Sequence, residues 1–261
     1  MKFTKFAAVG LLALAPLLSA QKRNDNAHSC ASDNPDLAII GCSAIIKSNS
    51  ETAKDRAAAF FNRGKAYLNL NSVDVALPDL TQAITLDPAY APAFYVRGIA
   101  YDMKPDFANA IRDYTEAIRL RPGYGDALNN RGKDYLTNGE FDKAIQDFSD
   151  VLRISPRDDA ALSNRCQAYT KKGDYEHGLP DCTEAIRLKP TAASFYTRGE
   201  SFRRQGDYDR AITDFSNALD FDQNYAKAYY ARGLAEQKKG DTVAADADIA
   251  KAKRIDPRVD R

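Results

Sequence analysis

A motif that returns every 34 residues constrains this chain more than any other feature of its sequence. The Arg-Gly pair at 97–98 returns at 131–132, 34 residues later. Pro122, which follows the first of these pairs, likewise has a counterpart 34 residues later, Pro156. A fixed period of this size is typical of arrays of repeated supersecondary units. Aligned on the period, the chain divides into six repeats, at 57–90, 91–124, 125–158, 159–191, 192–225 and 226–258.

Each repeat carries two helical stripes separated by a turn residue. Position 4 is large and apolar, position 8 is glycine in all repeats except the fourth, which has Cys166, and position 11 is aromatic in all repeats except the last. The spacing 4–8–11 places these residues on one helix face. After a turn residue at position 15, small residues at 20 and 27 flank a larger residue at 24, and a proline at position 32 ends every repeat but the fifth. The pattern predicts a pair of amphipathic helices in each repeat.

The combined pattern of small, aromatic and proline positions resembles the tetratricopeptide repeat, in six copies covering 57–258. The resemblance implies an all-α fold, a right-handed superhelical solenoid of six helix hairpins. It also implies that the first helix of each hairpin lines a concave groove.

Both ends of the array show features expected of caps, because a terminal hairpin has one face without a neighbour. In the last repeat, Thr242, Asp246 and Lys253 replace residues that are apolar in the other five. Before the first repeat, residues 21–56 read as a polar lead-in followed by a capping half-repeat, in which 35–48 forms a second helix without its first.

The first twenty residues predict a secretory signal peptide. Lys2 and Lys5 precede an apolar run at 6–18, and small residues follow it, which indicates cleavage before Gln21 and a periplasmic or secreted protein without a membrane span after cleavage. An uncleaved anchor is the alternative. Gln21 stands where a lipoprotein would need a cysteine, so no lipid anchor is expected. Loss of the two lysines changes the formal charge from +1 to −1.

The four cysteines are expected to form disulfides in an exported chain. Four cysteines allow three pairings, and the short-range one, Cys30–Cys42 with Cys166–Cys182, is the one we expect. The chain lacks the CxxC spacing of a zinc site, so no metal is predicted.

A charged residue recurs at two positions in all six repeats. Position 7 is always arginine and position 23 is always aspartate. In a hairpin that turns at position 15 these two lie opposite each other, which predicts an ion pair between the two helices. The alternative is a row of arginines that binds anions. Pro78 and Pro180 fall at position 22, where each either kinks the second helix or belongs to its first turn.

The sequence does not indicate an enzyme. Only two histidines are present, His28 and His177, and the chain has no nucleophile elbow or phosphate-binding loop. We therefore predict no catalytic residues and no cofactor. The near-neutral charge does not indicate a nucleic-acid partner.

The resemblance implies that positions 2, 5, 9, 12 and 13 of each first helix, called here the groove positions, face the ligand. The candidate groove residues are Phe61, Lys65, Tyr95, Asn129, Lys133, Gln167, Lys171, Tyr196, Arg203, Arg204, Lys227 and Tyr230. The groove positions hold seven basic and three acidic side chains, a formal charge of +4 that lies entirely in repeats four to six. An acidic partner, or one that presents a carboxyl terminus, is expected there, although the same lysines could simply be solvated.

These observations predict a non-catalytic scaffold of the bacterial cell envelope that binds a protein or an extended, acidic peptide. The alternative is a glycan-binding envelope protein whose tyrosines stack on peptidoglycan or lipopolysaccharide. The lysine–asparagine clamp by which some relatives hold a terminal carboxylate is not expected, since Phe61 and Ile99 occupy clamp positions. The sequence specifies neither the partner nor the oligomeric state.

Overall fold

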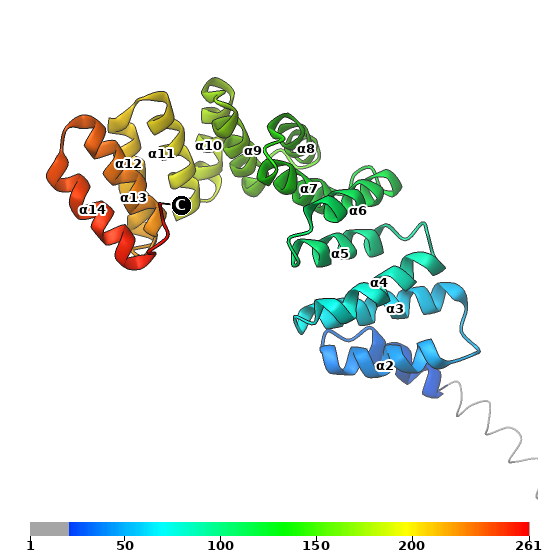
Figure 1. The fold of residues 1–261 in the computed structure, drawn as a ribbon. Coiled ribbons are helices and arrows are strands. Elements are labelled where there is room, and N and C mark those ends of the chain that lie inside the picture. The colour runs from blue at the N-terminus through cyan, green and yellow to red at the C-terminus, as the bar shows by residue number, and fades with distance from the viewer. Residues whose placement is uncertain (1–20, 261) are drawn as a thin grey trace, which may run out of the picture. The chain divides into compact units, whose positions relative to one another are not determined.

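The computed structural model describes residues 21–260, which are helical with no strand among them (Figure 1). Residues 21–30 are helical, and the helices that follow are α2 (Pro35–Lys47), α3 (Ala53–Asn69), α4 (Val73–Leu86), α5 (Ala91–Asp102), α6 (Phe107–Leu120), α7 (Gly125–Thr137), α8 (Phe141–Ile154), α9 (Asp159–Lys172), α10 (Tyr175–Leu188), α11 (Ala192–Gln205), α12 (Tyr208–Phe221), α13 (Ala226–Lys239) and α14 (Thr242–Ile255). The chain forms two compact units, Met1–Ala127 and Leu128–Arg261, with α7 crossing the boundary.

Within each unit, consecutive helices pack as hairpins and consecutive hairpins pack on each other. In the first unit, α3 pairs with α4 and α5 with α6, while α4 also contacts α5 and α2 covers α3. In the second unit the hairpins are α9–α10, α11–α12 and α13–α14, and α9, α11 and α13 also contact one another in sequence. The predicted all-α fold of stacked helix hairpins is confirmed.

The two helices of a hairpin meet where a glycine faces a buried ring. A Cβ atom on Gly132 would lie 2.8 Å from the ring of Phe148, and one on Gly98 would lie 2.6 Å from the ring of Tyr114. Both rings are fully buried. Position 8 is therefore small because the side chain at position 24 occupies the space above it.

In the fourth repeat a disulfide takes the place of this contact. Cys166 and Cys182 hold positions 8 and 24, are bonded to each other, and have Cα atoms 5.3 Å apart. The second disulfide joins Cys30 to Cys42, with Cα atoms 4.5 Å apart. The structure thus has the short-range pairing.

Four of the turns at position 15 require a left-handed backbone. Gly139, Gly173, Gly206 and Gly240 have φ between 77° and 92°, which glycine adopts without a steric penalty. Asn71 takes this role in the first repeat, with φ of 55°.

Pro78 and Pro180 lie inside α4 and α10, beyond the first turn of each helix. Each is exposed. The prediction that a late helix start would put them in the first turn is therefore wrong, because both helices begin five residues before the proline.

The N-terminal cap is more complete than the sequence suggests. Residues 21–30 are helical, so α2 does have a helix before it. The two cross very closely, since a Cβ atom on Gly41 would lie 2.6 Å from the carbonyl oxygen of Asn26. The predicted signal peptide, 1–20, lies outside the described residues. Within 21–260 the structure contains no helix with the length and hydrophobicity needed to cross a membrane.

Three exposed ion pairs each join an odd-numbered repeat to the repeat that follows it. Lys104 reaches back to Asp74 at 2.6 Å, Lys172 reaches back to Asp142 at 2.6 Å, and Lys239 pairs with Asp209 in the same way. These pairs join repeats one and two, three and four, and five and six.

Candidate functional site

All six arginines at position 7 form two-pronged ion pairs with the aspartate at position 23 of the same repeat. Arg131 is representative: its Nη2 and Nε atoms donate to the carboxylate of Asp147 at 2.7 and 2.9 Å. The Asp147 side chain is only 4% exposed. The predicted pair between the two helices is confirmed. The buried geometry shows that these arginines hold the hairpin together, as a planar guanidinium fork matches a carboxylate.

Several of these arginines also bind a third helix, which the sequence analysis did not anticipate. The Nη1 atom of Arg165 donates to the hydroxyl of Ser149 in the preceding repeat at 3.0 Å, and that hydroxyl donates to the Ile145 carbonyl oxygen. Equivalent bonds run from Arg63 to Ser43, from Arg97 to Thr81 and from Arg232 to Ser216.

A sequence signal for this contact exists at position 25. The residues there are Ser43 in the cap, then Thr81, Thr115, Ser149, Thr183, Ser216 and finally Ala250. Among these positions only that of the sixth repeat, Ala250, has no hydroxyl. Serine and threonine can accept from a guanidinium while donating to their own helix, so one residue type serves both helices.

The basic groove residues are mostly exposed. In the second unit the side chains of Lys133, Lys171, Arg204 and Lys227 are exposed, and that of Arg203 is half-buried. In the first unit Lys65 is exposed. The helices that carry Lys171, Arg204 and Lys227 are α9, α11 and α13, and α11 contacts both of the others.

Arg203 and Arg204 share one carboxylate. Nε of Arg203 lies 2.7 Å from Glu200 Oε1, and Nε of Arg204 lies 3.4 Å from Oε2. The hydrogen bond to Glu200 raises the pKa of Arg203. Two arginines and one glutamate leave this cluster with a formal charge of +1. The Arg204 side chain, 46% exposed, is the more available of the two.

The aromatic groove residues pack on partners that the sequence analysis missed. Phe61, Tyr95 and Tyr196 each contact the tyrosine that closes the same repeat, with ring centroids 5.0, 4.9 and 5.2 Å apart. Those partners are Tyr90, Tyr124 and Tyr225, at position 34. Burial raises the pKa of Tyr196, Tyr225 and Tyr90. These rings are half-buried and pack between the first helix of a repeat and the loop at the end of the same repeat.

Two groove positions of the third and fourth repeats hold amide side chains, Asn129 and Gln167, and a third amide, Asn164, lies at position 6. Asn164 Nδ2 donates to Asn129 Oδ1 at 3.0 Å, which links α7 to α9 within the second unit. Gln167 lies on α9 and is half-buried. Such amides can each donate and accept, which suits contacts to a peptide backbone. Tyr230, on α13, is half-buried as well.

Comparison with known families finds repeat models along most of the array. Models described as tetratricopeptide repeat match residues 54–125, 125–158 and 226–259, and one described as TPR repeat matches residues 199–240. A comparison with curated protein sequences gives no significant match.

Solved structures with the same fold include other repeat proteins. A tetratricopeptide repeat protein from Parabacteroides merdae is 18% identical, with a TM-score of 0.69 over 91% of this chain and 93% of its own. PilW, described as a type IV pilus biogenesis factor, is 16% identical, with a TM-score of 0.69 over 77% of this chain and 94% of its own. YrrB, described as having an unusual peptide-binding site, is 20% identical, with a TM-score of 0.54 over 68% of this chain and 92% of its own.

At these identities the structural neighbours speak for the fold. Together with the family models and the stacked hairpins, they show that the chain belongs to the tetratricopeptide repeat family.

Proposed function

We propose that this protein is a non-catalytic scaffold of the bacterial cell envelope that binds an extended, acidic segment of a partner protein on the second unit. Tetratricopeptide repeats serve protein–protein interaction. In this chain the ion pairs and aromatic residues mainly hold the repeats together, as is expected of a scaffold. The finer parts of the proposal, the acidic partner and the envelope, depend on the observations that follow.

The exposed basic residues on α9, α11 and α13 carry the proposal. Lys171, Arg204 and Lys227 occupy groove positions on three first helices, of which the middle one contacts both others. The only acidic groove residue of these repeats, Glu200, is already shared by two arginines. A surface of this kind favours an acidic segment and speeds its association.

The remaining groove residues of the second unit suit an extended chain. Asn129 and Gln167 offer amide groups for a peptide backbone, and Tyr230 is a half-buried aromatic side chain on the same unit. The half-buried packing of Tyr95 and Tyr196 against neighbouring tyrosines leaves little ring face free. For this reason we do not extend the proposal to glycans.

The envelope location rests on the two disulfides and on the signal-like sequence at 1–20. Structural disulfides persist in oxidising compartments, and both pairs are formed here. PilW, a structural neighbour, is described as a pilus biogenesis factor. YrrB, another neighbour, is described as binding peptides at an unusual site.

The proposal is tested first in cells. A photo-crosslinking amino acid placed at Tyr196 or Arg203, followed by mass spectrometry, should capture one partner at both positions. The same amino acid at Lys189, an exposed residue outside the groove positions, should not capture it. Capture at Lys189 alone would place the binding surface elsewhere.

The acidic preference is tested with an extended peptide of twelve residues rich in aspartate and glutamate. Replacing both Lys171 and Lys227 by glutamate should weaken binding about tenfold or more at low salt. The matched control replaces Arg157 and Lys189 by glutamate as well. Both residues are exposed and lie outside the groove positions, so this variant should bind the peptide as the wild type does. Affinity that does not fall as salt is raised would contradict the electrostatic part of the proposal.

A further inference from the structure

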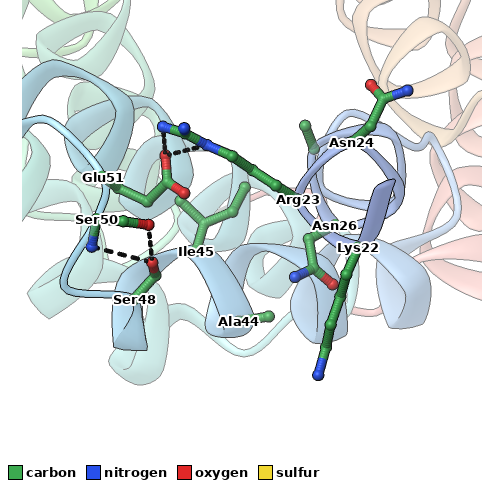
Figure 2. A pocket seen from close by; sticks show the side chains of 10 residues that line it. Lys22, Arg23, Asn24, Asn26, Ala44, Ile45, Ser48, Ser50 and Glu51 are labelled. Atoms are coloured by element: carbon green, nitrogen blue, oxygen red, sulfur yellow. Dashed lines mark hydrogen bonds and ion pairs between the residues drawn. The ribbon is translucent and has the colours of Figure 1, made fainter. Parts of the chain in front are cut away.

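The N-terminal cap contains a cavity that the proposed peptide surface does not use. It has a volume of about 820 Å³ and lies between the helical residues 21–30, α2 and the loop that leads to α3 (Figure 2). Ala44 and Ile45 of α2 line it together with Lys22, Asn26 and Ser48. The volume is in the range of small-ligand sites.

A buried carboxylate and an exposed arginine cross this cavity. Figure 2 shows the guanidinium of Arg23 reaching over to Glu51. Its Nη2 and Nε atoms donate to Glu51 Oε2 at 2.7 and 3.2 Å. The Glu51 side chain is only 7% exposed, whereas that of Arg23 is 54% exposed. The acceptor is thus fixed in the wall, and the donor comes from the solvent side.

A second cavity, of about 290 Å³, shares Arg23, Ile45 and Glu51 with the first and is lined also by Asp55 and Asn62. The Arg23 side chain therefore borders both cavities. If it swung out into solvent, it would leave the carboxylate facing an enlarged pocket.

This closure differs from that of the repeats. In three repeats an aromatic residue of the first helix packs on the tyrosine that precedes the next first helix. The cap has an ion pair in the comparable place. Arg23, from the helical residues 21–30, pairs with Glu51, which directly precedes Thr52, the N-cap of α3. An apolar seal excludes other molecules, whereas an ion pair exposed on one side can be exchanged for another cation.

We infer that the cap pocket binds a guanidinium group, the side chain of an arginine supplied by a partner, and that Arg23 occupies the site as an internal substitute until this arginine replaces it. The inference goes beyond the proposed function, because it assigns a second site, of opposite charge preference, on the first unit.

The charges that remain when Arg23 leaves favour a cation. The carboxyl groups that remain are those of Glu51, which lines both cavities, and of Asp55, which lines the smaller one. Hydrogen bonds from the Thr52 hydroxyl and amide lower the pKa of Asp55. Lys22 is the basic residue that remains in the lining of the larger cavity. Asn26 and Ser48 add polar side chains to the lining of the larger cavity, and the Ser48 hydroxyl already bonds with Ser50.

The test uses the full exported chain, labelled with ¹⁵N, and N-acetyl-arginine methylamide as the probe. Saturable amide shifts should appear around Ile45, Ser48 and Glu51. Arg23→Ala should lower the dissociation constant of the arginine probe about twofold to fivefold, because the substitution removes an internal competitor held by a half-exposed ion pair. Glu51→Gln should abolish saturation, and N-acetyl-citrulline methylamide, the neutral isostere, should not saturate the wild-type chain.

The citrulline probe keeps the test independent of how the Glu51 variant folds. Saturation by citrulline equal to that by arginine would overturn the inference, as would the absence of saturable shifts in the Arg23→Ala chain or shifts confined to the second unit. Free arginine, run in parallel, distinguishes the source of the guanidinium: weaker binding than the capped probe supports a peptide side chain, and tighter binding overturns the assignment to a partner protein.

Discussion

Each arginine at position 7 is a junction, because a guanidinium has enough donors for two partners. Arg165, for example, binds Asp181 in its own hairpin and Ser149 in the preceding repeat. The aspartate fixes one helix against the other, and the hydroxyl fixes one repeat against the next. Polar residues thus specify the register of a core whose apolar members are mostly small.

Replacing Arg131 by leucine should reduce the free energy of unfolding by about 2–4 kcal/mol, because it leaves Asp147 buried without a counter-charge. Urea unfolding followed by circular dichroism measures the loss. The control is Arg119→Leu, which breaks the exposed pair with Glu116 and should leave unfolding unchanged within error. A stable Arg131→Leu chain that fails to bind anions would support the alternative of an anion-binding row.

The pKa of His177 should lie above its ordinary value, because the hydrogen bond that its ring donates to Asp174 favours the protonated form. The protonated form is favoured in the folded state, so the stabilisation is fully present below the unfolded pKa of about 6.5 and is lost as the pH rises through the folded pKa. The ring resonances in NMR report the titration directly.

Asp174→Asn is the matched variant for this prediction, since asparagine also caps helices but carries no charge. It should return the His177 titration to its ordinary range. The stability gap between the wild type and His177→Gln should be present at pH 5.5 and absent at pH 8. A gap that grows with pH would contradict the assignment.

At the scale of the helix pair, the fourth hairpin fills the interface between its two helices in a different way from the hairpins beside it. Its neighbours fill the interface with a glycine and an aromatic ring, as in Gly132 with Phe148 and Gly199 with Phe215. The fourth hairpin uses the bond between Cys166 and Cys182 instead. The disulfide therefore supplies covalently what the other repeats obtain from ring burial.

Two double variants separate these contributions. Alanine at both cysteines removes the crosslink and leaves unfilled space, and should cost about 3–5 kcal/mol. Cys166→Gly with Cys182→Phe restores the packing of the neighbouring repeats and should cost about 2 kcal/mol less than the alanine pair. Chemical denaturation with and without reductant measures both. The variants keep the Cys30–Cys42 bond, so the wild type should lose more stability in reductant than either variant does. Equal losses in the two variants would show that the ring does not fit.

The helix hairpins and the Arg–Asp pairs were predictable from the sequence, because both repeat at a period that averages over local exceptions. The helical residues 21–30 were not, because their stripe is polar and holds no repeat signature. Tyr90, Tyr124 and Tyr225 were missed for a different reason. They stand at the junction of two repeats, and only the fold shows that they lie against the first helix of their own repeat. Arg23 and Glu51 share neither a motif nor a spacing with any other pair.

At the scale of the whole chain, each repeat depends mainly on its two neighbours. Deleting residues 192–225 joins Thr191 to Ala226, which matches Ala192 in residue type and position. The shortened chain should keep the same helical signal per residue and unfold at a lower urea concentration, because one interface between repeats is lost. An unfolded product would show that the array requires all six repeats.

The alternating pairs of Lys104 with Asp74, Lys172 with Asp142 and Lys239 with Asp209 give the surface a period of two repeats, twice that of the core. The repeating unit of these surface pairs is therefore a block of two hairpins. A chain lengthened by one such block would keep every lysine beside its aspartate, whereas one lengthened by a single hairpin would put the alternation out of phase. For anyone building longer versions of this protein, the natural increment is therefore the double repeat.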